Sequence, residues 1–190
     1  MTLKHFAPVL LLTAFTMGMW SCTDLSDYDR ERVSDAIADS LLSVTESRNI
    51  HMQLIEDGIR IVSVFSPYAA TYTRDGRSET DLRDSVHVAV LDSIGAVKTT
   101  VISRSARYYS YDSEFHFSDE VFVSTRDGRR LRTDYMEWSQ QNRTIHSPDF
   151  VIIVTETDSI TGFGLDAKDD LSTYQLTEVT GEFELEQRNR

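Results

Sequence analysis

The sequence has one cysteine, few basic residues and no apolar run longer than the one at its N-terminus. Because Cys22 is the only cysteine, a disulfide within the chain is excluded, and packing alone must hold the fold. Lys and Arg number 19 against 31 Asp and Glu, a formal net charge of -12. This balance excludes the basic face that nucleic acids require, and it repels an anionic membrane surface. The 190 residues allow one domain after an N-terminal segment.

The short motifs of common catalytic and metal sites are also missing. The sequence contains no Gly-x-Ser-x-Gly elbow, no phosphate-binding loop and no His-Glu-x-x-His pair. His87, His116 and His146 each lack a second ligand at zinc spacing, and alternation with apolar neighbours places His87 and His116 on an outer face. Carboxylates are expected at strand ends and turns, as solvated residues, at Glu114, Asp119, Glu120, Asp169 and Asp170. We therefore expect no enzyme, no metal and no cofactor.

The longest apolar run extends from Phe6 to Trp20. Its length of about 15 residues is short for a membrane span and typical of the apolar region of a secretory signal. The run leads into Met19-Trp20-Ser21-Cys22, which resembles a bacterial lipobox, although Trp20 replaces the usual small residue. The sequence predicts a lipoprotein signal over residues 1–21 with lipidation at Cys22, or alternatively an uncleaved N-terminal anchor.

An acidic tether is expected to follow over residues 22–50. Its apolar residues Val33, Ile37, Leu41 and Val44 have spacings of four, four and three, which place them on one stripe of a helix. The stripe could dock on the domain or on a partner, or the segment could be a partly ordered spacer.

A frame of residue types recurs in the remaining chain: an aliphatic residue, then Ser, Thr or Gly two places on, then Ala, Met or Leu five places on. Its copies are Val64, Ser66, Ala69; Val101, Ser103, Ala106; Leu131, Thr133, Met136; and Ile160, Gly162, Leu165. The copies start at residues 64, 101, 131 and 160, which are 37, 30 and 29 residues apart. A recurrence of this length indicates stacked supersecondary units that share one core.

Alternating apolar runs show that these units are strands. Period-two runs precede three of the frames, at Val86, Val88, Val90; at Val121, Val123; and at Val151, Ile153. Turn residues follow each run, at Ile94-Gly95, at Asp127-Gly128 and from Glu156 to Ser159. Each unit is therefore expected to be a hairpin-like strand pair that must stack on its neighbours to bury its apolar face.

The apolar residues of these strands would share one face if the units stack in register. The expected face comprises Val86, Val88, Val90, Val101, Phe115, Phe117, Val121, Val123, Leu131, Val151 and Ile153. It could be a closed core or a groove wide enough for acyl chains, and the sequence leaves both open.

Several segments between residues 55 and 185 carry a family resemblance. They include Phe65-Ser66-Pro67-Tyr68-Ala69, Ser103 to Tyr109, Leu131-Arg132-Thr133-Asp134, Val151-Ile152-Ile153 and Val179-Thr180-Gly181-Glu182-Phe183. The most specific is Gly162-Phe163-Gly164-Leu165-Asp166. In these segments the chain resembles the LptC family of lipopolysaccharide-transport proteins.

The resemblance implies an open, twisted β-jelly roll over residues 51–186, followed by a tail over residues 187–190. It implies a V-shaped interior that shelters the acyl chains of lipopolysaccharide while the sugar stays outside. It also implies a place on the periplasmic side of the inner membrane, between an ATP-driven (ABC) transporter and an LptA-like bridge protein. The expected lipid anchor departs from the transmembrane helix of the best-known members.

The two ends of an open sheet would bind the partner proteins. We expect the terminal edge, with Val179, Gly181 and Phe183, to add a strand to the next sheet protein. The first units, near Ile59 to Tyr72, would face the transporter. The alternative function is a structural envelope lipoprotein with a closed β core that scaffolds protein partners.

Overall fold

The computed structural model of the protein describes residues 43–184, the last three by their backbone alone. It is all-β, as expected. In chain order the strands are β1 Ser43–Glu56, β2 Ile59–Arg74, β3 Arg77–Arg83, β4 Val86–Leu91, β5 Val97–Ser103, β6 Ser105–Tyr109, β7 Glu114–Thr125, β8 Arg130–Ser139, β9 Thr144–Val154, β10 Asp158–Lys168 and β11 Tyr174–Glu184. Cys22, the signal segment and the stripe residues Val33, Ile37 and Leu41 lie outside the described residues. Within residues 43–184, no helix is long and apolar enough to cross a membrane.

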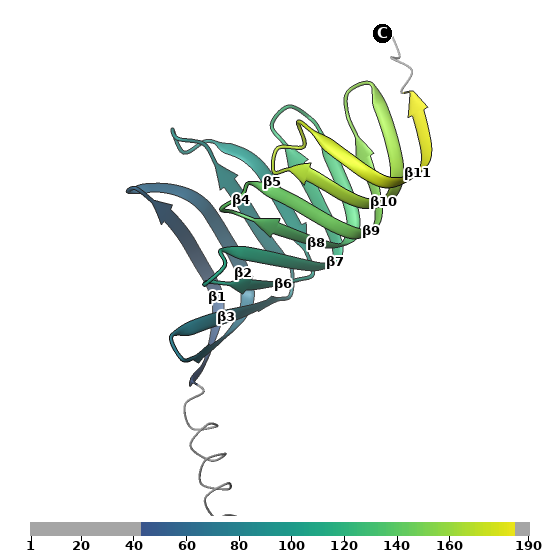
Figure 1. The fold of residues 1–190 in the computed structure, drawn as a ribbon. Helices are drawn as coiled ribbons and strands as arrows, with labels where there is room; N and C mark the ends of the chain where they lie inside the picture. The colour runs from purple at the N-terminus through teal and green to yellow at the C-terminus, as the bar shows by residue number, and fades with distance from the viewer. Residues whose placement is uncertain (1–42, 185–190) are drawn as a thin grey trace, which may run out of the picture. The chain divides into compact units, whose positions relative to one another are not determined.

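The strands form one antiparallel jelly-roll sheet whose two ends do not pair with each other. The order along the sheet is β11-β10-β9-β8-β7-β5-β4-β2-β3-β6, with β1 beside β2 and a further pairing of β6 with β7. Strands β7 to β11 follow one another as a meander, whereas β2–β4, β3–β6 and β5–β7 pair out of chain order. Among the described strands, β1 and β11 are therefore the edges, and the jelly roll is open (Figure 1).

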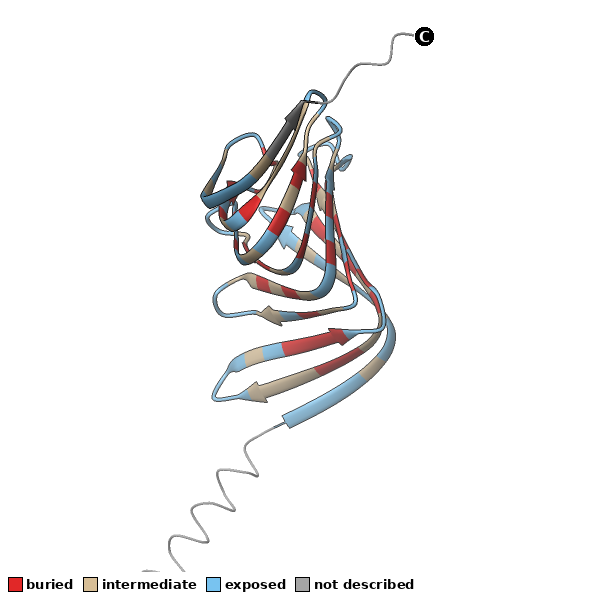
Figure 2. Cartoon of the chain, turned by 90° about the vertical axis from the view of Figure 1, so that its right-hand side faces the viewer, coloured by how far each residue is buried: buried red, intermediate tan, exposed pale blue. Residues whose placement is uncertain are grey.

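The long strands bend in the middle and so belong to two half-sheets. The first half-sheet contains β4 and β5 and the segments of the long strands that pair beside them. The second contains β3 and β6 and the remaining segments. Several bends coincide with a shift of register, for example between Ser118 and Val121 in β7. Such irregularities bend a strand and increase its twist, and Figure 2 shows the two arms that result.

The recurring frame marks these bends. Ser66, Ser103 and Thr133 are buried, and each donates a hydrogen bond from its side-chain hydroxyl to the carbonyl two residues ahead, at 2.8, 2.8 and 3.2 Å. The bond satisfies an inward-facing hydroxyl locally, at the point where the strand leaves one half-sheet for the other. In the fourth copy, glycine (Gly162) takes the place of the Ser or Thr. A side chain does not fit there, because the backbone carbonyl oxygen of Glu178 lies 2.2 Å from the position that a Cβ atom would take.

The predicted strands and turns are confirmed, and the boundary of the tether needs correction. Gly95 and Gly128 have φ values of 81° and 85°, in the left-handed region that favours glycine in turns. Residues 43–50, expected in the tether, belong to β1, with Ser43 paired to Thr73. Val44 is thus in a strand and not on a helical stripe. The first edge of the sheet is β1 and not the segment from Ile59 to Tyr72, which lies inside the sheet as β2.

Candidate functional site

One apolar row crosses the inner face of the first half-sheet from β1 to β10. Each residue of the row is paired in register with the next one: Met52, Val64, Val88, Val101, Val123, Leu131, Ile153 and Ile160. β-branched side chains predominate in this row because they pack well on a pleated surface. The row is therefore a continuous aliphatic surface that spans eight strands.

A second row crosses the inner face of the second half-sheet and is aromatic. Its residues, also paired in register, are Tyr108, Phe115, Trp138, Ile145, Ala167 and Tyr174. The ring of Phe115 lies 4.4 Å from that of Tyr108 and 5.5 Å from that of Trp138, between ring centroids. Phe117 lies one row nearer the bends, with its ring 5.7 Å from Phe115. Partial burial raises the pKa of Tyr108, since it disfavours the phenolate.

The two rows belong to one contiguous core. Of the eleven residues expected on the inner face, ten are buried, with exposed fractions between 0% and 3%, and Val90 is half-buried. The interior is thus filled by the protein's own side chains. At the two ends of the sheet the apolar surface continues into half-buried residues, Met52 and Leu54 on β1 and Tyr174 and Leu176 on β11.

The structure adds inner residues that the sequence analysis did not select. Leu82, Trp138 and Ile145 are buried in the same core. Met136 and Trp138 are apolar residues separated by one polar residue, and this alternation in the sequence could have identified Trp138 as an inner residue. Leu82 lies in the polar segment Arg77–Arg83, where no alternation identifies a strand.

The turn between β10 and β11 joins the two half-sheets at the mouth, the side of the interior away from the bends. The ammonium of Lys98 on β5 lies 3.2 Å from a carboxylate oxygen of Asp169 and 3.5 Å from one of Asp170. Thr99 donates a hydrogen bond to the carbonyl of Asp169 at 3.3 Å, and Leu171 is fully buried beneath. Asp169 is buried, so the expectation of a solvated carboxylate is wrong for it. We call these contacts the mouth clasp.

Within the mouth clasp, the surroundings of Asp170 favour its ionised form. A hydrogen bond from Ser172 and the charge of Lys98 lower the pKa of Asp170 to about 2. Its carboxylate therefore stays ionised, and the attraction to Lys98 does not depend on mild acidification.

Asp119 and Glu120 also differ from the expectation of strand ends. They lie within β7, at its bend, with φ values of 63° and 56°. Glu120 pairs with Arg104 at 3.0 Å on the exposed surface. These two carboxylates therefore belong to the bend of the strand.

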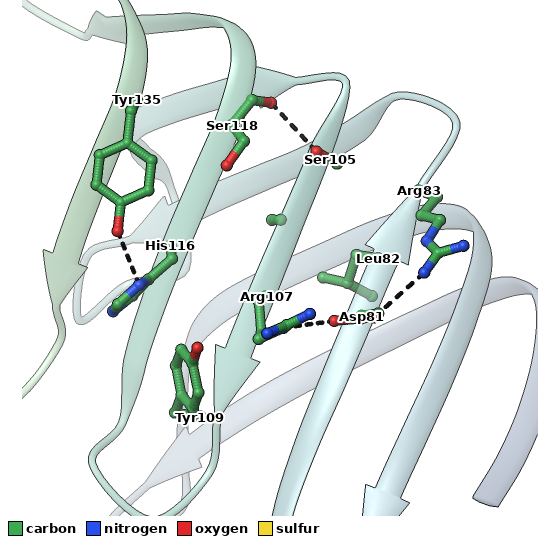
Figure 3. Close-up of a pocket in the computed structure, with 10 residues that line it drawn as sticks. Asp81, Leu82, Arg83, Ser105, Arg107, Tyr109, His116, Ser118 and Tyr135 are labelled. Carbon is green, nitrogen blue, oxygen red and sulfur yellow. Dashed lines mark hydrogen bonds and ion pairs between the residues drawn. The ribbon is translucent and has the colours of Figure 1, made fainter. Parts of the chain in front are cut away.

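The outer face of the second half-sheet carries a polar hollow of about 350 Å³ (Figure 3). Asp81 accepts hydrogen bonds there from Arg107 at 2.6 Å and from Arg83 at 3.3 Å. The Tyr135 hydroxyl lies 2.9 Å from Nδ1 of His116, and burial together with the Glu137 carboxylate raises the pKa of Tyr135. The charged groups of the hollow are thus paired among themselves.

The expected histidines are on outer faces, as alternation indicated. His87 is exposed and His116 half-buried, and His146 bonds Asp166 at 2.9 Å on the surface. Within the described part of the chain, no three His, Cys, Asp or Glu side chains are placed to hold a metal ion.

The edge strand β11 presents the residues expected to meet a partner. Val179 is 59% exposed, Gly181 is half-buried, and Phe183 is paired in register with Ser159. The Glu178 carbonyl points toward β10, where it lies against Gly162. Because backbone groups alternate in direction along a strand, the N–H and C=O of Val179 point away from the sheet. This edge is therefore free to pair among the described strands.

The comparisons with known proteins agree with this architecture. The family model described as "Lipopolysaccharide-assembly, LptC-related" matches residues 9–184. The chain belongs to the LptC family. Among curated proteins, none matches the chain. LptC proteins are components of lipopolysaccharide transport and are not a known enzyme family.

Proposed function

We propose that this LptC protein binds the acyl chains of lipopolysaccharide between its half-sheets. It would accept them from the inner-membrane ABC transporter and pass them to an LptA-like periplasmic bridge protein. The observation that supports this most directly is the pair of apolar rows, one of which begins at the edge strand β1 while the other ends at the edge strand β11. A continuous inner surface that ends at two pairing edges suits a cargo that moves from one sheet protein to the next.

Acyl chains would enter by separating the half-sheets. Each buried methylene contributes about 0.8 kcal/mol, which drives chains out of water. Because the interior is already packed, part of that gain offsets the separation of inner residues such as Phe117 and Val123. The net affinity would then be moderate, which suits a carrier that must release its cargo. Opening would break the mouth clasp while the bends keep the two halves connected.

The N-terminal segment would hold the domain at the membrane. We propose that Cys22 is lipidated after cleavage of residues 1–21, with an uncleaved anchor as the alternative. One acyl chain binds a membrane only reversibly, whereas several together anchor firmly. Either form would hold the β domain on the periplasmic side, and the inner membrane as its place rests on the family.

Photo-crosslinking in living cells tests the proposal. A photoreactive amino acid is placed at inner positions, Val88, Phe117, Val123 and Ile153, and at outer control positions, Arg126 and Arg132. Adducts with lipopolysaccharide are expected at the inner positions only and should disappear when ATP is depleted. Lys98→Gln, which weakens the mouth clasp, is expected to increase these adducts. Equal labelling of inner and outer positions would contradict a specific interior site.

The near-complete burial of the inner residues favours a second candidate function. A structural envelope lipoprotein with a permanently closed core would scaffold partners without binding lipid. In that case the inner positions yield no lipid adducts, with or without Lys98→Gln, while partner proteins remain bound.

The β11 edge gives a separate prediction for the bridge partner. Val179→Pro removes an N–H that points away from β10, so the sheet should fold normally, as edge strands tolerate proline there. Augmentation by an LptA-like protein would lose that donor and meet the proline ring. We expect at least a tenfold loss of affinity in a binding assay with the purified bridge protein.

Val179→Ala, which keeps the N–H, is the matched control and should bind normally. If Val179→Pro binds the bridge protein as well as Val179→Ala while its circular-dichroism melt is unchanged, β11 is not the pairing edge.

A further inference from the structure

Two polar side-chain atoms in the described residues are buried without any hydrogen-bond partner. They are Nε1 of Trp138 and Oε1 of Gln140. They belong to residues two places apart in the chain, at the end of β8 and directly after it. One is a donor and the other an acceptor. An unpartnered buried group costs about 1–3 kcal/mol, so two such groups within three residues of the chain call for an explanation.

Trp138 lies on the mouth side of the interior, and Gln140 begins the turn that follows β8. Trp138 is 3% exposed and lies in the aromatic row, which is the last inner row before the turns of the second half-sheet. Its ring packs on Phe115, and half-buried Tyr108 and Tyr174 lie at the ends of the same row. Residues toward the bends from this row are apolar, such as Phe117 and Met136. The unpaired indole N–H of Trp138 therefore belongs to the last inner row, and Gln140 belongs to the polar turn directly beyond it.

Polar groups elsewhere in the fold, in contrast to these two atoms, have hydrogen-bond partners. The inward hydroxyls of Ser66, Ser103 and Thr133 are bonded at the bends, and the carboxylate of Asp81 in the outer hollow is bonded twice. The polar atoms left open are those beside the region into which a cargo chain would extend.

We infer that Trp138 and Gln140 form a polar recognition site for an acyl chain that carries an amide or a hydroxyl group near its polar end. Such a group accepts a hydrogen bond from the indole N–H and donates one to the Gln140 oxygen. An ester or a carboxylate can only accept, and a plain alkyl chain can do neither. This inference rests on the proposed function, because it places the acyl chain in the interior.

Three uncharged probes of equal chain length isolate the two bonds: N-methyldodecanamide, methyl dodecanoate and dodecane. The protein is labelled with ¹⁵N, and the indole N–H signal of Trp138, identified by its loss in Trp138→Phe, is followed. One hydrogen bond is worth about a threefold to tenfold change in affinity. We expect the amide to bind most tightly, the ester next and dodecane least. The amide and the ester should move the Trp138 signal downfield.

Two conservative variants test the acceptor role of Gln140 and the donor role of Trp138 separately. Gln140→Leu should make the amide and the ester bind equally, while the downfield shift of the indole signal persists. Trp138→Phe keeps an aromatic ring on Phe115 and should make the ester bind no better than dodecane. Because phenylalanine is smaller than tryptophan, Trp138→Phe leaves a cavity in the core and should lower the melting temperature moderately, so the roles are judged from the order of probe affinities in each variant.

The outcomes separate this inference from the proposed function. If all three probes bind with equal affinity and the indole signal responds to each alike, the recognition site is wrong, while an apolar interior that takes acyl chains stands. If none of the probes binds, both the interior site and the recognition site are overturned.

Discussion

Replacing Phe117 by alanine is expected to lower the free energy of unfolding by about 3–5 kcal/mol, the cost of removing a buried aromatic ring and leaving a cavity. Phe117 lies on β7, is fully buried and packs between the two half-sheets beside Phe115. Its loss removes contacts from both arms of the interior. The measurement is urea unfolding of the full chain, followed by circular dichroism.

Phe122 provides the matched control on the same strand. It is 43% exposed on the outer face, where Arg132 lies 5.2 Å from its ring centroid. Phe122→Ala should cost less than about 1 kcal/mol, since it leaves no cavity and loses only an exposed cation–π contact. Equal losses for the two variants would contradict the assignment of inner and outer faces to β7.

The sequence predicts these faces well because alternation is a local property. Polar or exposed neighbours flank the inner residues Val86, Val88, Phe115 and Phe117. Because side chains alternate between the two faces of a strand, only one assignment of these residues to the inner face is possible. The recurring frame was equally readable, and the structure explains it by the bends of the strands. What the frame could not reveal is that its Ser and Thr members bond the backbone at those bends, because side-chain direction depends on the bend itself.

The sequence could not predict which strands pair with each other or that some polar segments form strands. β3 pairs with β6, and neither its polar residues nor the intervening strands indicate this. β1 begins with the polar run Ser43 to Asn49, most of which is exposed, so its strand character depends on pairing with β2. Its assignment to a helical tether followed the spacing of Val44 with earlier apolar residues, and the long-range ladder outweighed that local pattern.

Part of the candidate site could likewise be predicted from the sequence, and part of it could not. The apolar rows follow from residue type and alternation, so ten of the eleven chosen residues are buried together. Two features needed the structure: the mouth clasp, where Lys98 meets residues about 70 positions later in the chain, and the unpaired atoms of Trp138 and Gln140. Both depend on which turns approach each other across the interior, which no short-range pattern encodes.

The glycine-rich segment of β10 that carried the family resemblance gives the second large effect. Gly162→Ala would place a methyl group 2.2 Å from the Glu178 carbonyl and 3.0 Å from a methyl group of Leu176, so β10 and β11 would have to separate locally. Gly164 has the same neighbour strand, since a Cβ there would lie 2.6 Å from the Thr177 hydroxyl. The motif thus exists because β11 crosses β10 too closely for side chains.

We expect Gly162→Ala to cost about 1–3 kcal/mol, as overpacking does, and to raise hydrogen exchange along β11. Gly128→Ala is the control, because its Cβ would meet nothing within 4 Å and its cost comes from a φ of 85° alone. Its exchange should rise only at the turn between β7 and β8. Because β11 is the edge proposed to meet the bridge protein, Gly162→Ala should also weaken that binding, whereas Gly128→Ala should not. Normal exchange along β11 in Gly162→Ala would mean that the two strands can separate without cost, and the glycine would then need another explanation.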